Sequence, residues 1–515
     1  MINIEIFRKG NKEMEKSILQ CLENTTKRFP NKLAFEDINR GATYKEFTEN
    51  CRKVGTGLAK LNEINKPIAI FMDKSVACLE TMMGILYSGN FYTVLDNKSP
   101  EERIHHIFNT LSPIAIVTDK KNEKKARTLE FNGSIFVYED LICEKENTEL
   151  LKEISNEIID TDPMYILFTS GSTGVPKGTV ISHKAVLAYA TWVKDTFEIT
   201  EETKFGNQTP FYFSMSITDV FSTILTGATL YVIPKMYFSF PVKLLEYLKE
   251  KEINTIYWVP SALCIVANLG ALAEADLPDL RKVMFAGEVM PMKQLNMWRE
   301  KFPNIMFANL YGPTETTDIC TYYIVDREFE NTETLPIGKH CNNCDVMIIK
   351  DDGTRAGKGE EGELCARGSF LAMGYYNNPE KTNSVFVQNP LNKAYPEIIY
   401  KTGDIVKENE RGEIIYISRK DFQIKHMGYR IELGEIETAI NAIEGIIACA
   451  CVYDEKNSKI VLFYQGNKLE EKDLLEQAKA KLPNYMCPNE IHCIDRMPYN
   501  ANGKIDRKEL KNRLS

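Results

Sequence analysis

Short apolar runs alternate along most of this chain with segments of helical periodicity. The runs are rich in β-branched and aromatic residues, as in Pro67–Met72, Met164–Phe168, Thr229–Ile233 and Val283–Phe285. Strands that are apolar on both faces are typical of parallel sheets buried between helices. The sequence therefore predicts an α/β fold in which helices such as Val76–Ser88 and Val242–Lys251 connect the strands.

The texture changes twice toward the C-terminus. Between residues 345 and 416, short strands with Gly-rich turns predict a small antiparallel, barrel-like sheet. Beyond a charged stretch at Ser418–Phe422, we expect a helix over Leu433–Ile443 and strands over Ile447–Val452 and Ile460–Tyr464. We predict a large N-terminal domain of layered α/β subdomains, residues 1–419, and a small α+β domain, residues 420–515.

Composition excludes several classes of function. The 515 residues carry 63 basic and 72 acidic side chains, a net charge of −9, which argues against nucleic acid as a partner. No uncharged run approaches transmembrane length, and the first residues do not resemble a signal peptide. The 13 cysteines show no disulfide spacing, so we expect a cytoplasmic protein that binds no membrane.

One cysteine pair has the spacing of a metal site. Cys341 and Cys344 flank two asparagines, and His340 precedes them. A structural zinc site needs about four ligands, and no second pair follows. A loop with two free thiols is therefore the preferred interpretation.

A Gly- and hydroxyl-rich loop follows the strand Met164–Phe168. Its sequence, Thr169–Gly178, combines glycines that expose backbone N–H groups, hydroxyl donors and the cation of Lys177. This combination suits a polyphosphate, although the loop lacks the Gly-Lys-Ser/Thr ending of a Walker motif. A flexible linker is the alternative, but linkers seldom follow a buried strand directly.

A second loop, Asn309–Thr317, also follows an apolar run. Its carboxylate, Glu315, lies among hydroxyl residues and is suited to Mg²⁺, while Tyr311 offers a ring on which a base could stack. Alone this segment could be an ordinary turn before a capped helix. Paired with the first loop, it predicts the second wall of a nucleotide site.

These loops belong to a series of motifs that runs the length of the chain. On them the chain resembles the adenylate-forming superfamily, and most closely its stand-alone amino-acid adenylation enzymes. These are the D-alanine–carrier protein ligases and the adenylation domains of nonribosomal peptide synthetases. The further matching blocks are Gly362–Gly368, Gly374–Pro379, Tyr400–Asp404, Arg419–Lys425, Gly428–Glu432, Leu482–Met486 and Asn502–Asp506.

The resemblance implies a set of residues that act on ATP. The residues implied to bind ATP or AMP are Thr169, Ser170, Gly171, Ser172, Thr173, Gly174, Asn309, Leu310, Tyr311, Gly312, Asp404, Tyr416 and Arg419. Glu315 is implied to hold Mg²⁺, and Lys504, Thr314 and Lys177 are implied to be catalytic. A bridging role for Lys504 is physically reasonable, because attack of one anion on another needs a cation between them.

The same resemblance implies a second reaction. Asp421 matches the hinge about which the small domain rotates, and Gly428 matches the residue that leaves room for a pantetheine arm. We therefore expect adenylation of a small acid with release of pyrophosphate, then acyl transfer to the phosphopantetheine of a separate carrier protein. We expect the enzyme itself to be a monomer.

The predicted substrate pocket departs from the family pattern. Amino-acid members carry Phe-Asp-x-Ser where this chain has Phe213–Ser216, so Ser214 replaces the Asp that pairs with an α-ammonium group. The other pocket positions carry over as Met215, Thr218, Tyr257, Met284, Ala286, Leu310, Asp318, Ile319 and Lys504. Asp318 is a new carboxylate in this pocket.

Two interpretations of Asp318 remain open at this point. It could cap a helix or face water, or it could meet a polar group far from the substrate's carboxyl. In the second case a β- or ω-amino acid, or an aryl acid with hydroxyl or amino groups, fits the pocket. An α-hydroxy or α-keto acid would also not need the lost Asp.

Three other functions compete with the one we expect. An acyl-CoA synthetase would release acyl-CoA, and a true D-alanine–carrier protein ligase would accept D-alanine despite Ser214. A catalytically inactive binding protein is disfavoured, because Lys504, Glu315 and Asp404 are all present.

Overall fold

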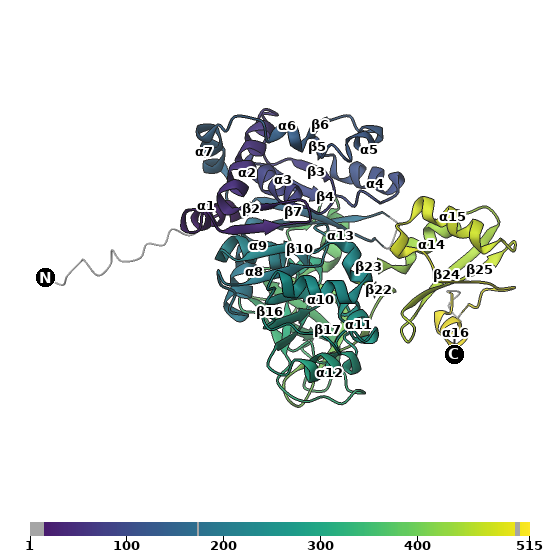
Figure 1. The fold of residues 1–515 in the computed structure, drawn as a ribbon. Coiled ribbons are helices and arrows are strands. Elements are labelled where there is room, and N and C mark those ends of the chain that lie inside the picture. The colour runs from purple at the N-terminus through teal and green to yellow at the C-terminus, as the bar shows by residue number, and fades with distance from the viewer. Residues whose placement is uncertain (1–14, 172–174, 500–504, 515) are drawn as a thin grey trace.

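The computed structural model describes residues 15–171, 175–499 and 505–514. A large body contains three sheets, and a smaller lobe follows it near the C-terminus, drawn in yellow in Figure 1. Two predicted segments, Ser172–Gly174 and Lys504, lie outside the described residues.

The largest sheet has nine strands. Its order is β15 (Lys339–His340), β14 (Thr321–Ile324), β13 (Met306–Tyr311), β12 (Lys282–Phe285), β11 (Thr255–Trp258), β9 (Lys204–Asn207), β10 (Thr229–Val232), β1 (Leu33–Glu36) and β2 (Gly41–Thr43). The strands from β13 to β1 pair in parallel, and the outer strands at both edges pair antiparallel. The predicted buried parallel strands of this region are confirmed.

The second large sheet has seven strands. Its order is β18 (Gly374–Tyr375), β8 (Lys177–Ser182), β7 (Pro163–Thr169), β4 (Phe91–Val94), β3 (Pro67–Phe71), β5 (Ala115–Thr118) and β6 (Ser134–Val137). The strands from β7 to β6 are parallel, whereas β8 returns antiparallel to β7. β7 and β8 are therefore antiparallel neighbours, and β18 forms the edge of the sheet beyond β8.

Helices cover both sheets. In the large body they are α1 (Ile18–Arg28), α2 (Tyr44–Ala59), α3 (Val76–Tyr87), α4 (Glu101–Leu111), α5 (Glu123–Thr128), α6 (Tyr138–Leu141), α7 (Thr148–Glu157), α8 (His183–Thr196), α9 (Ser216–Thr226), α10 (Pro241–Glu250), α11 (Pro260–Asn268), α12 (Met292–Lys301) and α13 (Pro379–Val385), with 3₁₀ turns η2 (Lys235–Ser239) and η3 (Thr314–Thr316).

Local sequence fixes the two helices that matter for the site. Ser182 caps α8 by accepting the N–H of Ala185 at 3.2 Å. Gly227 ends α9 at φ +89°, a conformation in which a Cβ would lie 2.6 Å from the ring of Phe29. Both helices are thus held at defined ends, and they pack against each other, α8 beside β8 and α9 beside β9 and β10.

A third sheet is entirely antiparallel, as the Gly-rich turns predict. It contains β16 (Cys344–Ile349), β17 (Glu361–Gly368), β20 (Ile398–Glu408) and β19 (Phe386–Gln388), with β21 (Ile414–Arg419) also paired to β20. Asp404 and Arg419 face each other across the last pair. This sheet therefore carries two of the predicted nucleotide residues.

The small lobe has its own hydrophobic clusters. The hairpin β22 (Gln423–His426) and β23 (Tyr429–Glu432) precedes α14 (Leu433–Asn441), β24 (Ile446–Asp454), β25 (Lys459–Gly466), α15 (Glu471–Lys481), η4 (Asn484–Met486), β26 (Glu490–Cys493) and α16 (Arg507–Asn512). Its core packs residues such as Ile436, Leu462 and Leu474 together. Figure 1 shows the hairpin between this lobe and the large body.

Candidate active site

One cavity of about 850 Å³ lies between the two large sheets and the small lobe. Its lining comes mainly from segments that follow the carboxyl ends of parallel strands. Thr169 ends β7 and Ser170 follows it, Val259 follows β11, and Ala286 and Gly287 follow β12. Ligands of open α/β sheets bind at these ends, so the topology itself predicts this position.

The nucleotide part of the cavity contains a carboxylate held from two sides. Oδ2 of Asp404 accepts a hydrogen bond from the Tyr311 hydroxyl. Oδ1 forms an ion pair with Arg419, whose Nη1 lies 2.8 Å away. The ammonium group of Lys425 lies 5.0 Å from the centre of the Tyr311 ring. Burial lowers the pKa of Lys425, while Asp404 opposes that shift. In this arrangement Lys425 lies over Tyr311, the ring predicted to stack with a base.

Glu315 has three close side-chain partners, one tyrosine and two cations. It is fully buried, its Oε2 lies 2.6 Å from Arg430 of β23, and its Oε1 accepts the Tyr375 hydroxyl at 2.5 Å. Lys177 lies 3.8 Å from Oε1. Burial opposes ionisation, yet Arg430 and Lys177 hold the pKa of Glu315 well below its usual range.

In the observed position of the small lobe, Glu315 has no free oxygen for a metal ion. Mg²⁺ needs an accessible carboxylate oxygen, and both oxygens here already have close partners. A guanidinium from the small lobe takes the place that the sequence predicts for the cation. No group of three or more His, Cys, Asp or Glu suited to a metal occurs within the described ranges.

Lys177 begins β8 and lies in the wall behind the cavity. Burial, reinforced by the charge of Arg430, lowers its pKa to about 8. Its ammonium group faces Glu315 and the Tyr375 ring, whose centre is 5.1 Å away. A lysine in this environment is a cation held in place by one carboxylate.

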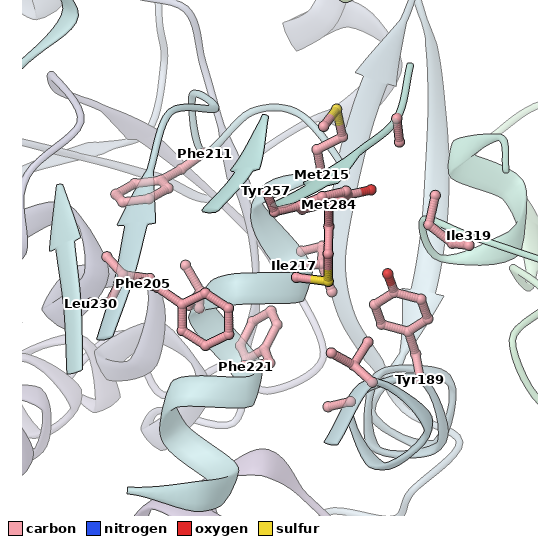
Figure 2. Packing of buried hydrophobic residues seen from close by; sticks show 14 of the residues in the cluster. Tyr189, Phe205, Phe211, Met215, Ile217, Phe221, Leu230, Tyr257, Met284 and Ile319 are labelled. Atoms are coloured by element: carbon pink, nitrogen blue, oxygen red, sulfur yellow. The ribbon is translucent and has the colours of Figure 1, made fainter. Parts of the chain in front are cut away.

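The acid part of the cavity ends at Asp318. This carboxylate is 1% exposed, so the expectation that it faces water is wrong. Oδ2 accepts hydrogen bonds from Tyr189 at 3.0 Å, Thr218 at 2.9 Å and Tyr257 at 3.0 Å. Figure 2 shows Tyr189 and Tyr257 with their hydroxyls directed toward the space beside Ile319.

The backbone before Asp318 is strained. Thr317 has φ +69°, which is unusual for a β-branched residue and costs on the order of 1–3 kcal/mol. Its hydroxyl donates to the Phe370 carbonyl at 2.8 Å and holds this turn. At Gly312 a Cβ would lie 2.3 Å from the Asp318 carbonyl oxygen, so only glycine allows the two segments to pack. Strain of this kind is typical of functional sites.

The small lobe closes the cavity through its hairpin. Gly428, at φ +80°, donates its N–H to Glu288 Oε1 at 2.9 Å, and a Cβ there would lie 2.5 Å from Val259. Ser170 donates to the Arg430 carbonyl at 2.7 Å and accepts the Glu432 N–H at 3.1 Å. The phosphate-type loop and the hairpin are thus directly connected.

A buried ion pair joins the two bodies at the edge of the cavity. Arg103 of α4 pairs with Glu435 of α14, and Gly171 donates its N–H to the same carboxylate at 3.2 Å. Burial raises the pKa of Glu435, and Arg103 opposes this shift. Together with Arg430, this contact places a charged cluster across the interface.

The structure gathers some predicted residues at the cavity and places others behind it. Those that line it are Thr169, Ser170, Ser214, Met215, Ala286, Tyr311, Gly312, Thr314, Asp318, Ile319, Asp404, Arg419 and Gly428. Those of the described residues that do not are Gly171, Lys177, Thr218, Tyr257, Met284, Asn309, Leu310, Glu315, Tyr416 and Asp421. Asn309 instead donates to the Pro336 carbonyl at 2.8 Å.

Sequence reasoning missed four residues of this site. Arg430 lies within a recognised motif, but the motif gives no direction for its side chain. Tyr189, Arg103 and Glu435 reach the site only through the tertiary arrangement. The one signal in the sequence was a carboxylate, Asp318, at a predicted pocket position without an evident partner. It did not indicate that Tyr189 would be that partner.

The cysteine pair beside His340 lies at the start of β16. Cys341 and Cys344 are buried free thiols, and His340 Nδ1 faces their backbone carbonyls.

No helix in the described part of the chain is both long and apolar enough to cross a membrane.

The cavity lies at the carboxyl ends of the parallel strands and is closed by the β22–β23 hairpin of the small lobe. This arrangement is that of an adenylate-forming enzyme. The chain belongs to the AMP-binding enzyme family, which matches residues 22–376, and the AMP-binding enzyme C-terminal domain matches residues 435–504. Enzymes of this family are AMP-forming ligases that use ATP.

Individual relatives agree with this assignment. Tyrocidine synthase 1 of Brevibacillus parabrevis is 30% identical over 96% of this chain, which spans only 45% of that relative. The D-alanine–D-alanyl carrier protein ligase of Bacillus cytotoxicus is 29% identical, covering 96% of this chain and 98% of the relative. The structure of holo-PA1221, an NRPS protein containing adenylation and PCP domains, shares the fold (TM-score 0.84, 21% identity, 97% and 84% coverage).

Proposed function

We propose that this protein joins a small carboxylic acid to the phosphopantetheine thiol of a separate carrier protein. In the first step the acid's carboxylate attacks the α-phosphorus of ATP and pyrophosphate leaves. In the second step the thiol attacks the acyl carbon and AMP leaves. The observation that carries the proposal is the single cavity that joins the Asp404 region, the acid pocket at Asp318 and the hairpin at Gly428.

The residues around the first step have distinct proposed roles. Asp404 and Arg419 are suited to the ribose and Tyr311 and Gly312 to the adenine side. Thr169, Ser170, Gly171 and Lys177 are suited to the phosphates, because they combine N–H, hydroxyl and ammonium donors. Lys504, with Thr314, would stabilise the charge that develops between carboxylate and phosphate.

Gly428 supports the second step. The cavity lining includes Val259 and Gly428, and the absence of a side chain at Gly428 leaves a passage between α11 and the hairpin. An extended thiol arm needs such a passage. Rotation at Asp421, in the linker between β21 and β22, would exchange this hairpin for the segment that carries Lys504.

The proposed function extends to the domain boundary, the oligomeric state and the acceptor. We place the domain boundary at residues 419/420, and we infer a monomer in the cytoplasm. The carrier is preferred to coenzyme A as acceptor because a relative that this chain matches over nearly its whole length is a carrier protein ligase, and a protein of the same fold combines adenylation and PCP domains.

ATP–pyrophosphate exchange over a panel of acids tests the first step. We expect exchange with a narrow set of acids, and thioester formation on a phosphopantetheinylated carrier but not on free coenzyme A. Exchange with no acid would contradict adenylation. Efficient formation of acyl-CoA without loading of any carrier would instead identify an acyl-CoA synthetase.

A further inference from the structure

The acid pocket contains a buried carboxylate, Asp318, whose hydrogen-bond partners are hydroxyl groups. Tyr189, Thr218 and Tyr257 all donate to Oδ2 of Asp318. A carboxylate has about four lone-pair sites on two oxygens, so three donors saturate that oxygen. These three residues lie outside the cavity lining, whereas Asp318 lines it together with Ser214, a further hydroxyl that acts on the carboxylate, so a ligand would meet the carboxylate beside Ser214.

The carboxylate has no cationic partner within the described part of the chain. No Lys, Arg or His forms an ion pair with Asp318, and the groups that act on it are hydroxyls, Ser214 included. Burial raises the pKa of Asp318 to about 6, and the hydroxyls limit that rise. A buried charge that lacks a counter-charge is unfavourable, so a ligand cation would stabilise this site.

The walls around this carboxylate are apolar. Met215, Ala286 and Ile319 line the cavity beside it and are almost fully buried. Apolar walls that end in one anion suit an alkyl chain with a terminal cation. They do not suit a polar chain, and an aromatic amine is uncharged at neutral pH.

We infer that the acid activated by this enzyme is a β- or ω-amino acid, whose distal ammonium group pairs with the carboxylate of Asp318. This inference rests on the proposed adenylation function and narrows its substrate. The usual charged partner of an α-ammonium is absent because Ser214 stands in its place. The cation therefore meets the deeper carboxylate instead.

Tyr189 is a positioning residue for this recognition. It lies on α8, outside the predicted pocket set, and its ring packs against Phe370 at a centroid distance of 5.5 Å. It touches the substrate only through Asp318. Loss of its hydroxyl would remove a donor from the carboxylate and raise the pKa of Asp318 further.

The experiment compares charged and uncharged acids of matched length. Exchange and calorimetric binding are measured with 3-aminopropanoate, 4-aminobutanoate and 5-aminopentanoate, and with butanoate, pentanoate and D-alanine. We expect one distal amino acid to exceed its uncharged analogue by about hundredfold or more, and Asp318→Asn to abolish that ratio. Equal use of the uncharged analogue, or preference for D-alanine, would overturn the inference.

Calorimetric binding of a distal amino acid tests the pocket assignment independently of the proposed adenylation activity. If no acid supports exchange but calorimetry shows that a distal amino acid binds the unmodified protein and not Asp318→Asn, the pocket assignment stands and adenylation fails. Binding of no distal amino acid would overturn the assignment.

Tyr189→Phe supplies a second variant that keeps the ring. Ammonium binding requires ionised Asp318, so it is lost as pH falls through the pKa of that carboxyl. We expect this acidic limb to move to higher pH in Tyr189→Phe. Tyr92→Phe, which removes a buried hydroxyl that makes no hydrogen bond among the described residues, is the control and should leave the profile unchanged. An unmoved limb in Tyr189→Phe would contradict the positioning role.

Discussion

Single residues carry most of the proposed chemistry, and the glycine of the hairpin is the clearest case. Gly428 combines a left-handed backbone with a close approach to Val259. Either condition alone would favour glycine, and together they leave no room for a side chain. A variant at this position therefore combines two effects, backbone strain and obstruction of the proposed passage, and a control must distinguish them.

We expect Gly428→Ala to impair thioester formation while pyrophosphate exchange continues. The added methyl group would meet Val259 at 2.5 Å and narrow the passage proposed for the thiol. The two half-reactions are measured separately, with the acyl-adenylate supplied for the second.

Gly359→Ala is the matched control for this variant. Gly359 has a similar φ of +78°, but nothing lies within 4 Å of its ideal Cβ. It shares the backbone strain and lacks the obstruction. Equal losses in both variants would show that strain, and not the passage, explains the effect.

Lys504→Ala tests the first half-reaction at a position outside the described residues. Loss of a cation that stabilises the transition state costs on the order of hundred- to thousandfold in rate. We expect pyrophosphate exchange to fall by that factor, with ATP binding retained. Thioester formation from supplied acyl-adenylate should change much less, and equal losses in both steps would contradict the assignment.

At the scale of secondary-structure elements, the linker between β21 and β22 decides whether the lobe can turn. Arg419 ends β21 and donates to Asp421 from Nε at 2.6 Å, and Asp421 accepts the N–H of Gln423 at 3.2 Å. One carboxylate therefore fixes the linker in the conformation observed. Burial opposes ionisation, yet Arg419 lowers the pKa of Asp421.

Asp421→Pro should spare pyrophosphate exchange and block carrier loading. Proline fixes φ near −65°, and the linker then cannot absorb the backbone change that a rotation requires. Single-turnover measurements of both steps would detect this. Normal carrier loading by the variant would count against a rotating lobe.

At the scale of the whole molecule, the fold was predictable and the docking of its parts was not. Strands such as β3 and helices such as α3 begin where the apolar pattern predicts and end within one residue of it. These patterns report local burial, which the chain itself determines. The contact of Arg430 with Glu315 joins residues 115 positions apart, and no local pattern specifies it.

Arg430→Gln should loosen the small lobe. Removing one partner of a buried ion pair costs roughly 3–5 kcal/mol, because Glu315 keeps its charge without the guanidinium. We expect faster proteolytic cleavage in the linker around Asp421, with an unchanged circular dichroism spectrum.

Arg411→Gln serves as the control, since Arg411 lies on an exposed turn. It should leave the cleavage rate unaltered. Cleavage of Arg430→Gln at the rate of the unmodified protein would mean that the contact does not hold the lobe in solution.

The contact of Ser170 and Gly171 with the small lobe has a kinetic consequence. While the hairpin and Glu435 engage these two residues, the same donors are not available to a departing pyrophosphate. In the reaction that we propose, pyrophosphate therefore leaves before the lobe reaches this position, and thiol attack follows its release. Such an order gives ping-pong kinetics, and it removes pyrophosphate, the reactant that the reverse of the first step needs, before the acyl group is transferred.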